Sequence, residues 1–355
     1  MLVAPRSRAV STTIVASLLI VVVVVAGLGF YFYSTSTTRG GTTTTGGSKV
    51  FKIILFTDVP SQTSYAISLT GGFNAAVQKL NNTNGYTIKT AYAYNIGYGD
   101  AVAFEQSYAS QGYNLIIGGD FGYDASINQV AQSFPSLQFF GTSFAHTAAN
   151  VGTYGSDVWE GEFEAGVLAG LMTKSNIIGL VTAFSFKEAN YAINAYLAGA
   201  KLVNPNAKIV YTFAGSFADP VKGENAAASL AALGADVIAG WGDGLTDGAI
   251  AGAAKAGVYS IGYLHDSNTL APNSVITSVL WNQTSYFYKA ILAAESGQIG
   301  YKIYTLPIYP DQVVKLTPFY NVAPAIAAKA NAVIQNITQG KIIPPANQTL
   351  PAQGA

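Results

Sequence analysis

From residue 50 onward, short runs of β-branched and aromatic residues alternate with longer stretches of helical periodicity. Runs of about four to eight such residues, bounded by turn residues, are typical of buried strands. The pattern therefore predicts strands over Phe51–Phe56, Thr87–Tyr92, Asn114–Ile117, Gln138–Gly141, Ile177–Val181, Lys208–Phe213, Asp236–Ala239 and Tyr259–Gly262.

The stretches between these strands have the periodicity of amphipathic helices. Gly112, Gly234 and Gly257 end three of them, as expected for glycines in the left-handed conformation after a helix. Alternating strands and helices favour parallel sheets, and nine or more such units in roughly 300 residues exceed one sheet, so we expect two α/β lobes. The predicted helices are Gly71–Asn81, Ala101–Ser110, Gly161–Met172, Tyr191–Leu202, Gly223–Leu233 and Thr246–Ala256.

The first 48 residues have a different pattern. Ile14 to Tyr33 is an almost wholly apolar stretch of 20 residues, long enough as a helix to cross a bilayer. Arg6 and Arg8 precede it, which predicts a cytoplasmic segment over 1–13, an anchor over 14–33 and an extracytoplasmic remainder. The alternative is a cleaved secretory signal. The start also resembles archaeal class III signals, which are cut ahead of the apolar stretch, and 34–48 reads as a Thr/Ser/Gly-rich stalk.

Composition and charge exclude several classes of function. Lysine plus arginine equals aspartate plus glutamate, at 18 each, so no net charge favours nucleic acid. Cysteine is absent and only His146 and His265 are histidines, so we expect no metal centre, no cofactor and no thiol chemistry. No arginine follows Arg39, and arginine is the usual bidentate partner of carboxylates and phosphates, so amino acids and nucleotides are poor candidate ligands.

Aromatic rings and single carboxylates or amides follow four of the predicted strands and the apolar run Ile276–Leu280. In parallel α/β folds ligands bind beyond the carboxyl ends of the strands, so these segments are candidate ligand contacts. Aromatic rings offer flat stacking faces, and single carboxylates or amides can bind the edge of a heterocycle or sugar hydroxyls. The five segments are Thr57-Asp58, Gly118–Tyr123, Thr182–Phe186, Gly240–Gly244 and Trp281-Asn282.

Enzymatic interpretations have weaker support in the residues. Gly240–Gly244 is glycine-rich after a strand but has neither the P-loop pattern nor the GxGxxG spacing of phosphate sites. His265-Asp266 could be half of a proton relay, but no nucleophile motif accompanies it. Glu160, Glu162 and Glu164 are expected to be a solvated first turn of a helix. No catalytic residue is therefore predicted.

Several sequence blocks, in order, resemble the basic membrane lipoprotein (BMP) family, the substrate-binding proteins of purine and nucleoside ABC importers. The resemblance covers about residues 50–345. Thr277–Asn282 is similar to a branch in which T-S-V-V-W-N replaces the T-S-x-x-K of nucleoside binders. The other blocks are Gly161–Gly166 with Leu171–Lys174, Ala195–Ala200 with Val203–Pro205, Ser216–Pro220 with Lys222-Gly223, Gly234–Ile238, and Ala256–Tyr263.

The resemblance implies the type I periplasmic-binding-protein fold, with two doubly wound lobes joined by three crossovers near 156, 268 and 303. It divides the chain into a first lobe over 49–155 and 269–303, a second over 156–268 and 304–345, and a flexible tail over 346–355. Trp281 stands where nucleoside binders have a lysine that contacts the ligand. The ligand-binding residues that the resemblance implies are Tyr65, Phe121, Phe184, Trp241 and Trp281 as rings, with Asn95, Asp243 and Asp266 as polar contacts.

From this we predict an anchored, extracytoplasmic solute-binding protein at the cell membrane. It would capture a purine base or nucleoside by closure of two lobes and deliver it to an ABC permease and its ATPase. The alternatives are a surface sensor with the same fold and a nucleoside hydrolase that uses Asp243 and Asp266. The low charge density also fits an acidophilic archaeon, for which we expect a flat stability profile from about pH 2 to 6.

Overall fold

The computed structural model describes residues 49–354, apart from 84, 143–144, 157–158 and 307–313. In this described part no helix is both long and apolar enough to cross a membrane. The predicted cytoplasmic segment 1–13, anchor 14–33 and stalk 34–48 lie outside the described residues.

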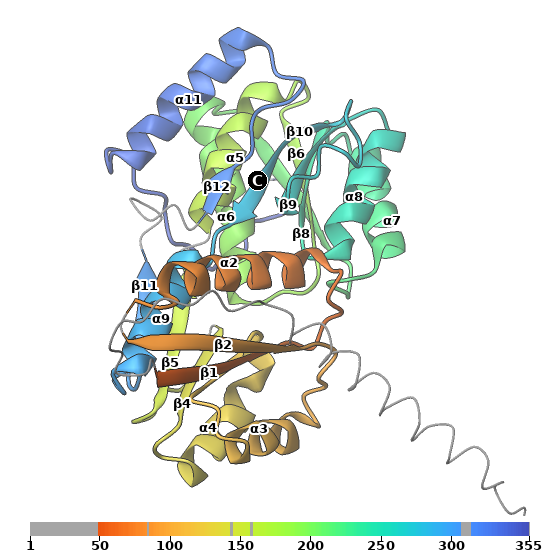
Figure 1. Ribbon diagram of the computed structural model, residues 1–355. Coiled ribbons are helices and arrows are strands. Elements are labelled where there is room, and N and C mark those ends of the chain that lie inside the picture. Colours follow the sequence, from red (N-terminus) through yellow and green to blue (C-terminus); the bar gives the residue numbers. More distant parts are fainter. Residues whose placement is uncertain (1–48, 84, 143–144, 157–158, 307–313, 355) are drawn as a thin grey trace, which may run out of the picture. The chain divides into compact units, whose positions relative to one another are not determined.

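The first lobe is built on a six-stranded sheet with the order β11-β5-β4-β3-β1-β2, and every neighbouring pair is parallel. Helices α2 and α9 cover one face, and α3 and α4 cover the other (Figure 1). The strands are β1 (Lys49–Phe56), β2 (Tyr86–Ala93), β3 (Leu115–Gly118), β4 (Gln138–Thr142), β5 (Val151–Ser156) and β11 (Ile303–Leu306). The helices are α2 (Ser64–Leu80), α3 (Ala101–Ser110), the 3-10 turn η1 (Phe121–Tyr123), α4 (Asp124–Ser133) and α9 (Thr284–Glu295).

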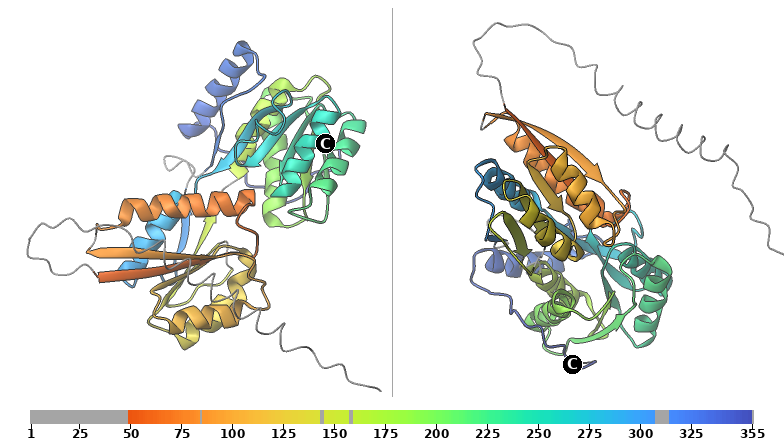
Figure 2. Two further views of the ribbon diagram at one scale, coloured as in Figure 1. Left: turned by 45° about the vertical axis from the view of Figure 1, so that its right-hand side comes forward. Right: turned by 90° about the horizontal axis from the view of Figure 1, so that it is seen from below.

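The second lobe has a second six-stranded sheet with the order β12-β10-β9-β8-β6-β7, in which only β12 is antiparallel to its neighbour. Helices α5 and α6 pack together on one face, α7 and α8 on the other, and α11 lies along α5 (Figures 1 and 2). The strands are β6 (Ile177–Thr182), β7 (Lys208–Phe213), β8 (Val237–Trp241), β9 (Tyr259–Leu264), β10 (Val275–Trp281) and β12 (Val314–Leu316). The helices are α5 (Trp159–Met172), α6 (Lys187–Val203), α7 (Pro220–Ala232), α8 (Gly244–Lys255) and α11 (Pro324–Thr338).

Local sequence signals set the ends of these helices. The Thr63 side chain accepts a hydrogen bond from the Ala66 amide and begins α2, which is how threonine stabilises a helix start. Helices α3, α7 and α8 are followed by Gly112, Gly234 and Gly257 with φ of 73°, 93° and 70°, which confirms the predicted left-handed glycines. The helices therefore stop where the sequence indicated.

The chain passes between the two sheets three times, and one predicted crossing is wrong. Strand β10 belongs to the second sheet, and α9 packs on α2 of the first lobe, so the second crossing lies at 281–284 and not at 268. In the run 267–274 the two serines are buried and tied to strands: Ser274 Oγ lies 2.9 Å from Ser260 Oγ, and the Ser267 amide donates to Ser278 Oγ at 3.0 Å. Strand β11 also stays in the first sheet up to Leu306, beyond the predicted boundary at 303.

The predicted flexible tail over 346–355 is also wrong for the residues that the structure describes. The Asn194 side-chain amide donates to the carbonyl oxygens of Asn347 and Thr349, both at 2.9 Å. The Gln353 side chain exchanges two hydrogen bonds with the backbone of Tyr211, at 3.1 and 2.8 Å. The tail therefore pairs with backbone N–H and C=O groups of β7, the edge strand of the second sheet, which would otherwise be exposed to water.

Candidate functional site

The candidate site lies at the carboxyl ends of the parallel strands. Asp58 follows β1 and Asp120 follows β3 in the first lobe, while Trp241 ends β8 and Trp281 ends β10 in the second. In a parallel sheet the carboxyl ends lie along one edge, so each lobe gathers its candidate residues on that edge.

The second lobe contributes a continuous series of aromatic contacts. The series begins with Phe184, which is 46% exposed, and passes through Trp241, which is only 7% exposed. Aromatic residues that extend from the surface into the interior give a flat ligand an accessible ring to contact first and, deeper in the protein, a ring surface shielded from water. The ring centroids lie 5.5 Å apart for Phe184 and Phe217, 5.9 Å for Phe217 and Phe186, 5.6 Å for Phe186 and Trp241, 5.4 Å for Trp241 and Tyr263, and 5.6 Å for Tyr263 and Trp281.

Phe121 of the first lobe continues the series. Its ring stacks on Phe186 at 6.5 Å with an interplanar angle of 27°, although 54% of the Phe121 side chain is exposed. Tyr65, on the first turn of α2, donates from its hydroxyl to the Gly119 carbonyl oxygen at 2.5 Å, and burial raises the pKa of its phenol. The first lobe therefore adds two rings: Tyr65, held by the backbone of its own lobe, and Phe121, stacked on the second lobe.

Two hydrogen bonds join the lobes beside these rings. The backbone N–H of Tyr65 donates to Asp243 Oδ1 at 3.2 Å, so a carboxylate of the second lobe lies at the N-terminus of α2, where the helix dipole favours negative charge. Ser68 Oγ donates to the Trp281 carbonyl oxygen at 3.2 Å, next to the second crossing. The candidate site is thus bounded by residues of both lobes that already contact one another.

Three buried polar atoms at the site have no hydrogen-bond partner among the described residues: Asp243 Oδ2, Trp281 Nε1 and the Tyr263 hydroxyl oxygen. Asp243 is only 7% exposed and Tyr263 only 4%. Buried polar groups are nearly always paired, so such atoms in a folded protein point to a ligand or to bound water. Together they offer an acceptor, a donor and a hydroxyl, which suits the edge of a polar planar ligand.

The first lobe carries a pair of carboxyl groups bridged by a phenol. The Tyr98 hydroxyl lies 2.9 Å from Asp58 Oδ2 and 2.7 Å from Asp120 Oδ1, but it has a single proton to donate. Burial and the charge of Asp58 raise the pKa of Asp120 to about 6, although hydrogen bonds from the Gly122 amide and Tyr98 lower it. Near neutral pH this pair can accept hydrogen bonds from ligand hydroxyl or amino groups.

Asn95 and Asp266 lie apart from this arrangement of contacts. Asn95 is exposed with a φ of 58°, and its amide donates to the Val59 carbonyl oxygen, as in a turn. Asp266 is exposed and accepts from the Asn268 amide at 3.1 Å and the Tyr320 hydroxyl at 2.6 Å, so it fastens the loop after β9. Tyr65, Phe121, Phe184, Trp241, Asp243 and Trp281 share the contacts described above.

Sequence reasoning missed several residues of the site. Phe186 lies in the segment after β6, where its alternation with Phe184 was the available signal. Phe217 lies in the Ser216–Pro220 block, which was noted only for the family resemblance. Asp58 and Asp120 were recognised as following strands but not chosen. Tyr98 carries no signal of its own, because only the fold brings it to Asp58 and Asp120.

The prediction that Glu160, Glu162 and Glu164 form a solvated turn is wrong for two of them. Glu162 is 0% exposed and Glu164 is 3% exposed, because α5 is apolar on nearly every side and packs between α6 and the second sheet. Glu162 Oε1 accepts a hydrogen bond from Trp241 Nε1 at 3.0 Å, directly behind the ring series. Burial raises the pKa of Glu162 to about 8.

The glycines of Gly240–Gly244 are explained by packing. A Cβ atom on Gly244 would lie 2.5 Å from the Ala218 carbonyl oxygen, and one on Gly240 would lie 2.6 Å from the Thr246 side chain. Close approach of backbone segments requires glycine here. This segment gives no independent support to phosphate binding.

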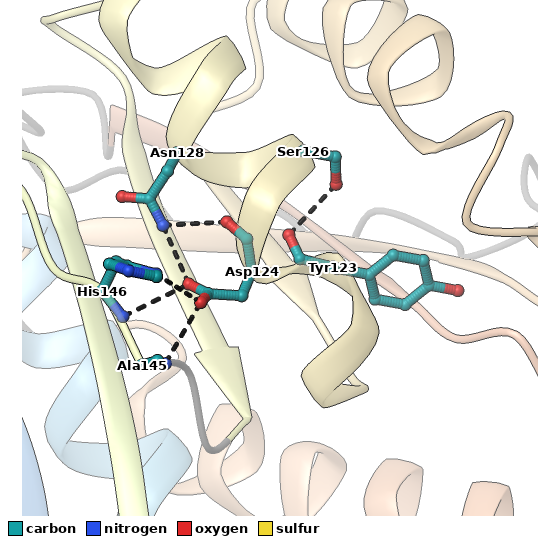
Figure 3. Close-up of polar contacts among 6 residues, drawn as sticks. All are labelled: Tyr123, Asp124, Ser126, Asn128, Ala145 and His146. Carbon is teal, nitrogen blue, oxygen red and sulfur yellow. Dashed lines mark hydrogen bonds and ion pairs between the residues drawn. The ribbon is translucent and has the colours of Figure 1, made fainter.

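The two histidines lie in separate surroundings. The His146 ring Nδ1 lies 2.7 Å from Asp124 Oδ2, and Asp124 also accepts from the Ala145 amide and the Asn128 side chain, which fastens the segment after β4 to the start of α4 (Figure 3). His265 Nε2 lies 3.8 Å from Asp247 Oδ1. Within the described residues no group of three or more His, Asp or Glu side chains is placed to hold a metal ion.

Two α/β lobes with three crossings, facing rings and unpaired polar atoms define a two-lobed binding protein. The family model of PnrA-like ABC transporter substrate-binding proteins (Bmp) matches residues 68–348. The chain therefore belongs to this family, which confirms the resemblance seen in the sequence. The family consists of substrate-binding proteins and not of enzymes.

Curated relatives differ in the ligands that their names give. A purine-binding protein of Brucella abortus is 28% identical over 275 residues, covering 76% of each chain. A putative ABC transporter glucose-binding protein of Haloferax volcanii is 29% identical over 210 residues, 59% of this chain and 53% of the relative, so the chain spans about half the length of that protein. A nucleoside-binding protein of Lactococcus lactis is 32% identical over 129 residues, 36% of this chain and 37% of the relative.

Solved structures show the same fold. A solute-binding protein of an ABC transporter system from Aeropyrum pernix has a TM-score of 0.67 at 17% identity, covering 84% of this chain and 94% of that one. A transcriptional activator from Bacillus halodurans has a TM-score of 0.67 at 17% identity, covering 83% and 100%. The two-lobed periplasmic-binding-protein fold with parallel sheets is thus confirmed.

Proposed function

We propose that this chain captures a purine base or nucleoside between its lobes and delivers it to an ABC permease. The observation that carries the proposal is the series of rings from Phe184 to Trp281, with the unpaired Asp243 Oδ2 and Trp281 Nε1 beside it. Stacking of a base on an aromatic ring is worth about 1–3 kcal/mol per base and accepts any flat heterocycle. The unpaired acceptor and donor then select among bases by their polar edges.

The family and two of the relatives support the same ligand class, since one is named a purine-binding and another a nucleoside-binding protein. Capture requires only that the ligand bind the closed arrangement of lobes more tightly than the open one. The contacts of Tyr65 with Asp243 and of Phe121 with Phe186 cross between the lobes, so a ligand there would contact both.

The experiment is calorimetric titration of the purified full chain with adenine, adenosine, guanosine and inosine, with glucose as the competing ligand. We expect micromolar or tighter binding of at least one purine. Binding of glucose alone would contradict the purine proposal and would follow the name of the Haloferax volcanii relative.

Hydrolysis of the ligand is not proposed. The carboxyl pair that it would need, Asp243 and Asp266, is divided between a buried position at the rings and an exposed loop position held by Tyr320. Product analysis after incubation with adenosine checks this, because a binding protein returns its ligand unchanged.

We also propose that residues 14–33 hold the binding domain at the outer face of the cell membrane. The uninterrupted apolar stretch and the arginines before it support this. Mass spectrometry of the intact protein from membranes distinguishes retention of 14–33 from cleavage after it. A form that begins near residue 34 and is found free of membranes would contradict the anchor.

A further inference from the structure

His265 lies beside an acid other than its neighbour in the sequence. Its ring Nε2 is 3.8 Å from Asp247 Oδ1, whereas Asp266 accepts a hydrogen bond from the Tyr320 hydroxyl. Asp247 is on the first turn of α8, His265 directly follows β9, and these two elements pack against each other (Figure 1). The acid and the imidazole therefore meet at the carboxyl-end edge of the second sheet, where the ring series also lies.

The backbone that leads into His265 is strained. Leu264, the last residue of β9, has a φ of 68°, in the left-handed region that bulky side chains rarely adopt. Such a conformation persists only where the surrounding structure holds it, and it is found most often at ligand sites. A constraint on the backbone thus accompanies the placement of the His265 ring beside Asp247.

This acid and imidazole carry buried polar atoms that the protein leaves unpaired. Asp247 Oδ1 and His265 Nδ1 have no hydrogen-bond partner among the described residues. The same is true of Asp243 Oδ2, on the residue before α8, which is 7% exposed. The side chains of Asp247 and His265 are 35% and 31% exposed, so they are open to solvent. Unpaired polar atoms beside such an opening point to a ligand or to bound water.

The three side chains offer groups that suit a pair of hydroxyls. Burial raises the pKa of Asp247, His265 lowers it and the charge of Asp243 raises it, so the three groups lie close enough to influence one another. A carboxylate oxygen accepts hydrogen bonds, and an imidazole nitrogen donates or accepts according to its tautomer. A hydroxyl group does both, so two neighbouring hydroxyls satisfy Asp247 and His265 together. Carboxylates bind ribose hydroxyls in this way in other parallel α/β folds.

The spacing along α8 separates these groups from the rings. Trp241 ends β8, Asp243 stands two residues later, and Asp247 lies one helical turn beyond Asp243. One turn advances about 5.4 Å, which is comparable to the size of a sugar ring. A base that stacks on Trp241 with its edge at Asp243 would therefore direct a substituent, and not the base itself, toward Asp247.

We propose that Asp247 and His265 form a hydroxyl-binding subsite for the ribose of a nucleoside, so that this chain binds nucleosides more tightly than free purine bases. This inference rests on the proposed function and decides between the two ligand classes that it leaves open. A ligand that lacks one hydroxyl leaves a carboxylate oxygen or an imidazole nitrogen of the subsite unpaired, so its affinity falls by about 10- to 100-fold.

A series of ligands tests the subsite on the unaltered full chain. Calorimetric titration compares adenosine with adenine, 2′-deoxyadenosine and 3′-deoxyadenosine, which all carry the same base. We expect adenosine to bind about tenfold or more tightly than adenine, and at least one deoxynucleoside to lose a comparable factor. Equal affinities for adenosine and adenine overturn the subsite but leave the proposed function standing, because a purine is still bound. If none of the four binds, the proposed function fails together with the subsite.

Two variants and a matched control then assign the effect to residues. Asp247→Asn replaces an acceptor oxygen by a donor group, and His265→Phe keeps a ring without nitrogens. Asp266→Asn is the control, since it makes the same change in charge one residue from His265, on a side chain held by Tyr320. The readout is the ratio of adenosine affinity to adenine affinity, in which a general loss of stability cancels.

We expect this ratio to fall at least about fivefold in Asp247→Asn and in His265→Phe, and to stay within about twofold of the wild type in Asp266→Asn. Adenine affinity itself should change little in all three. A ratio unchanged in Asp247→Asn, or lowered equally in Asp266→Asn, overturns the assignment. Should Asp247→Asn fail to fold, His265→Phe and the deoxynucleosides decide.

Discussion

The two lobes contribute different chemistry to the candidate site. The second lobe presents rings from the segment after β6 and from β8, β9 and β10 in unbroken contact, with Trp241 at the centre. The first lobe presents the carboxyl groups of Asp58 and Asp120, bridged by the Tyr98 hydroxyl, and the exposed ring of Phe121, which contacts the second lobe.

This difference indicates a division of work. Stacking is strong but tolerant of ligand identity, whereas hydrogen bonds to a carboxyl group reject ligands that cannot donate. The second lobe is therefore expected to supply most of the affinity and the first lobe most of the selectivity. Each prediction below changes one side of this comparison, beginning with the largest effect on binding.

The largest loss is expected from the ring of Trp281. Trp281→Ala removes a stacking surface and an unpaired N–H donor at the second crossing, so purine affinity should fall about 10- to 100-fold, or ~1–3 kcal/mol. Calorimetric titration measures it. Tyr108→Ala is the control, because that ring packs on Phe104 and Tyr113 in the outer layer of the first lobe. Equal losses in both variants would show an effect of stability and not of stacking.

A smaller loss is expected from Asp243. Asp243→Asn keeps one acceptor for the Tyr65 amide but turns the buried free oxygen into a donor group, so affinity should fall about tenfold. Asp266→Asn, at the exposed loop position, should leave affinity within about twofold. Titration of both variants with the same purine compares them directly. A larger loss of affinity in Asp266→Asn than in Asp243→Asn would show that Asp266 contacts the ligand, as the family resemblance implied.

Most of the fold, but only part of the site, could be predicted from the sequence. Strands β1 and β6 to β9 were recognisable because buried parallel strands are short apolar runs between glycines and polar turns. Helices α4, α9 and α11 were not predicted; in α4 the apolar positions are few and are interrupted by Asn128 and Gln132. The second crossing, which the family resemblance placed near 268, was misplaced because Ser267 and Ser274 are buried within the second lobe and the chain stays there through β10.

For the site, rings that directly follow strands were predictable, and contacts across the fold were not. Trp241 and Trp281 end strands, so their position follows from local sequence. Glu162 reads as an ordinary acidic residue in a first helical turn, and only the packing of α5 buries it against Trp241. Sequence alone does not show which face meets the site when a helix, like α5, has no separate polar and apolar faces.

On the first lobe the expected effect is a shift in pH dependence. An ionised Asp120 accepts hydrogen bonds and a protonated one cannot accept as well, so affinity should decline as pH falls through about 6. The Tyr98 hydrogen bond lowers the pKa of Asp120, so Tyr98→Phe should raise that pKa and move the decline to higher pH, with only a few-fold loss at pH 7. Titrations at pH 5 to 8 measure the midpoint. An unchanged midpoint would mean that Asp120 does not contact the ligand.

The smallest effect on binding is expected from Glu105, which is buried on α3 with its carboxyl group hydrogen-bonded to Ser126 of α4, and which should influence stability alone. Glu105, Glu162 and Glu164 all have pKa values raised by burial to about 8. In the unfolded chain each would titrate near 4.5, so between these values the folded protein holds the extra proton. Stability is then greatest below about pH 4.5 and declines toward pH 8, by up to about 1.4 kcal/mol per pH unit for each group. Glu105→Gln removes one of these three groups. Tm should therefore fall less between pH 5 and 8 in this variant than in the wild type, while its purine affinity should equal that of the wild type. A Tm that rises from pH 5 to 8 would contradict this prediction.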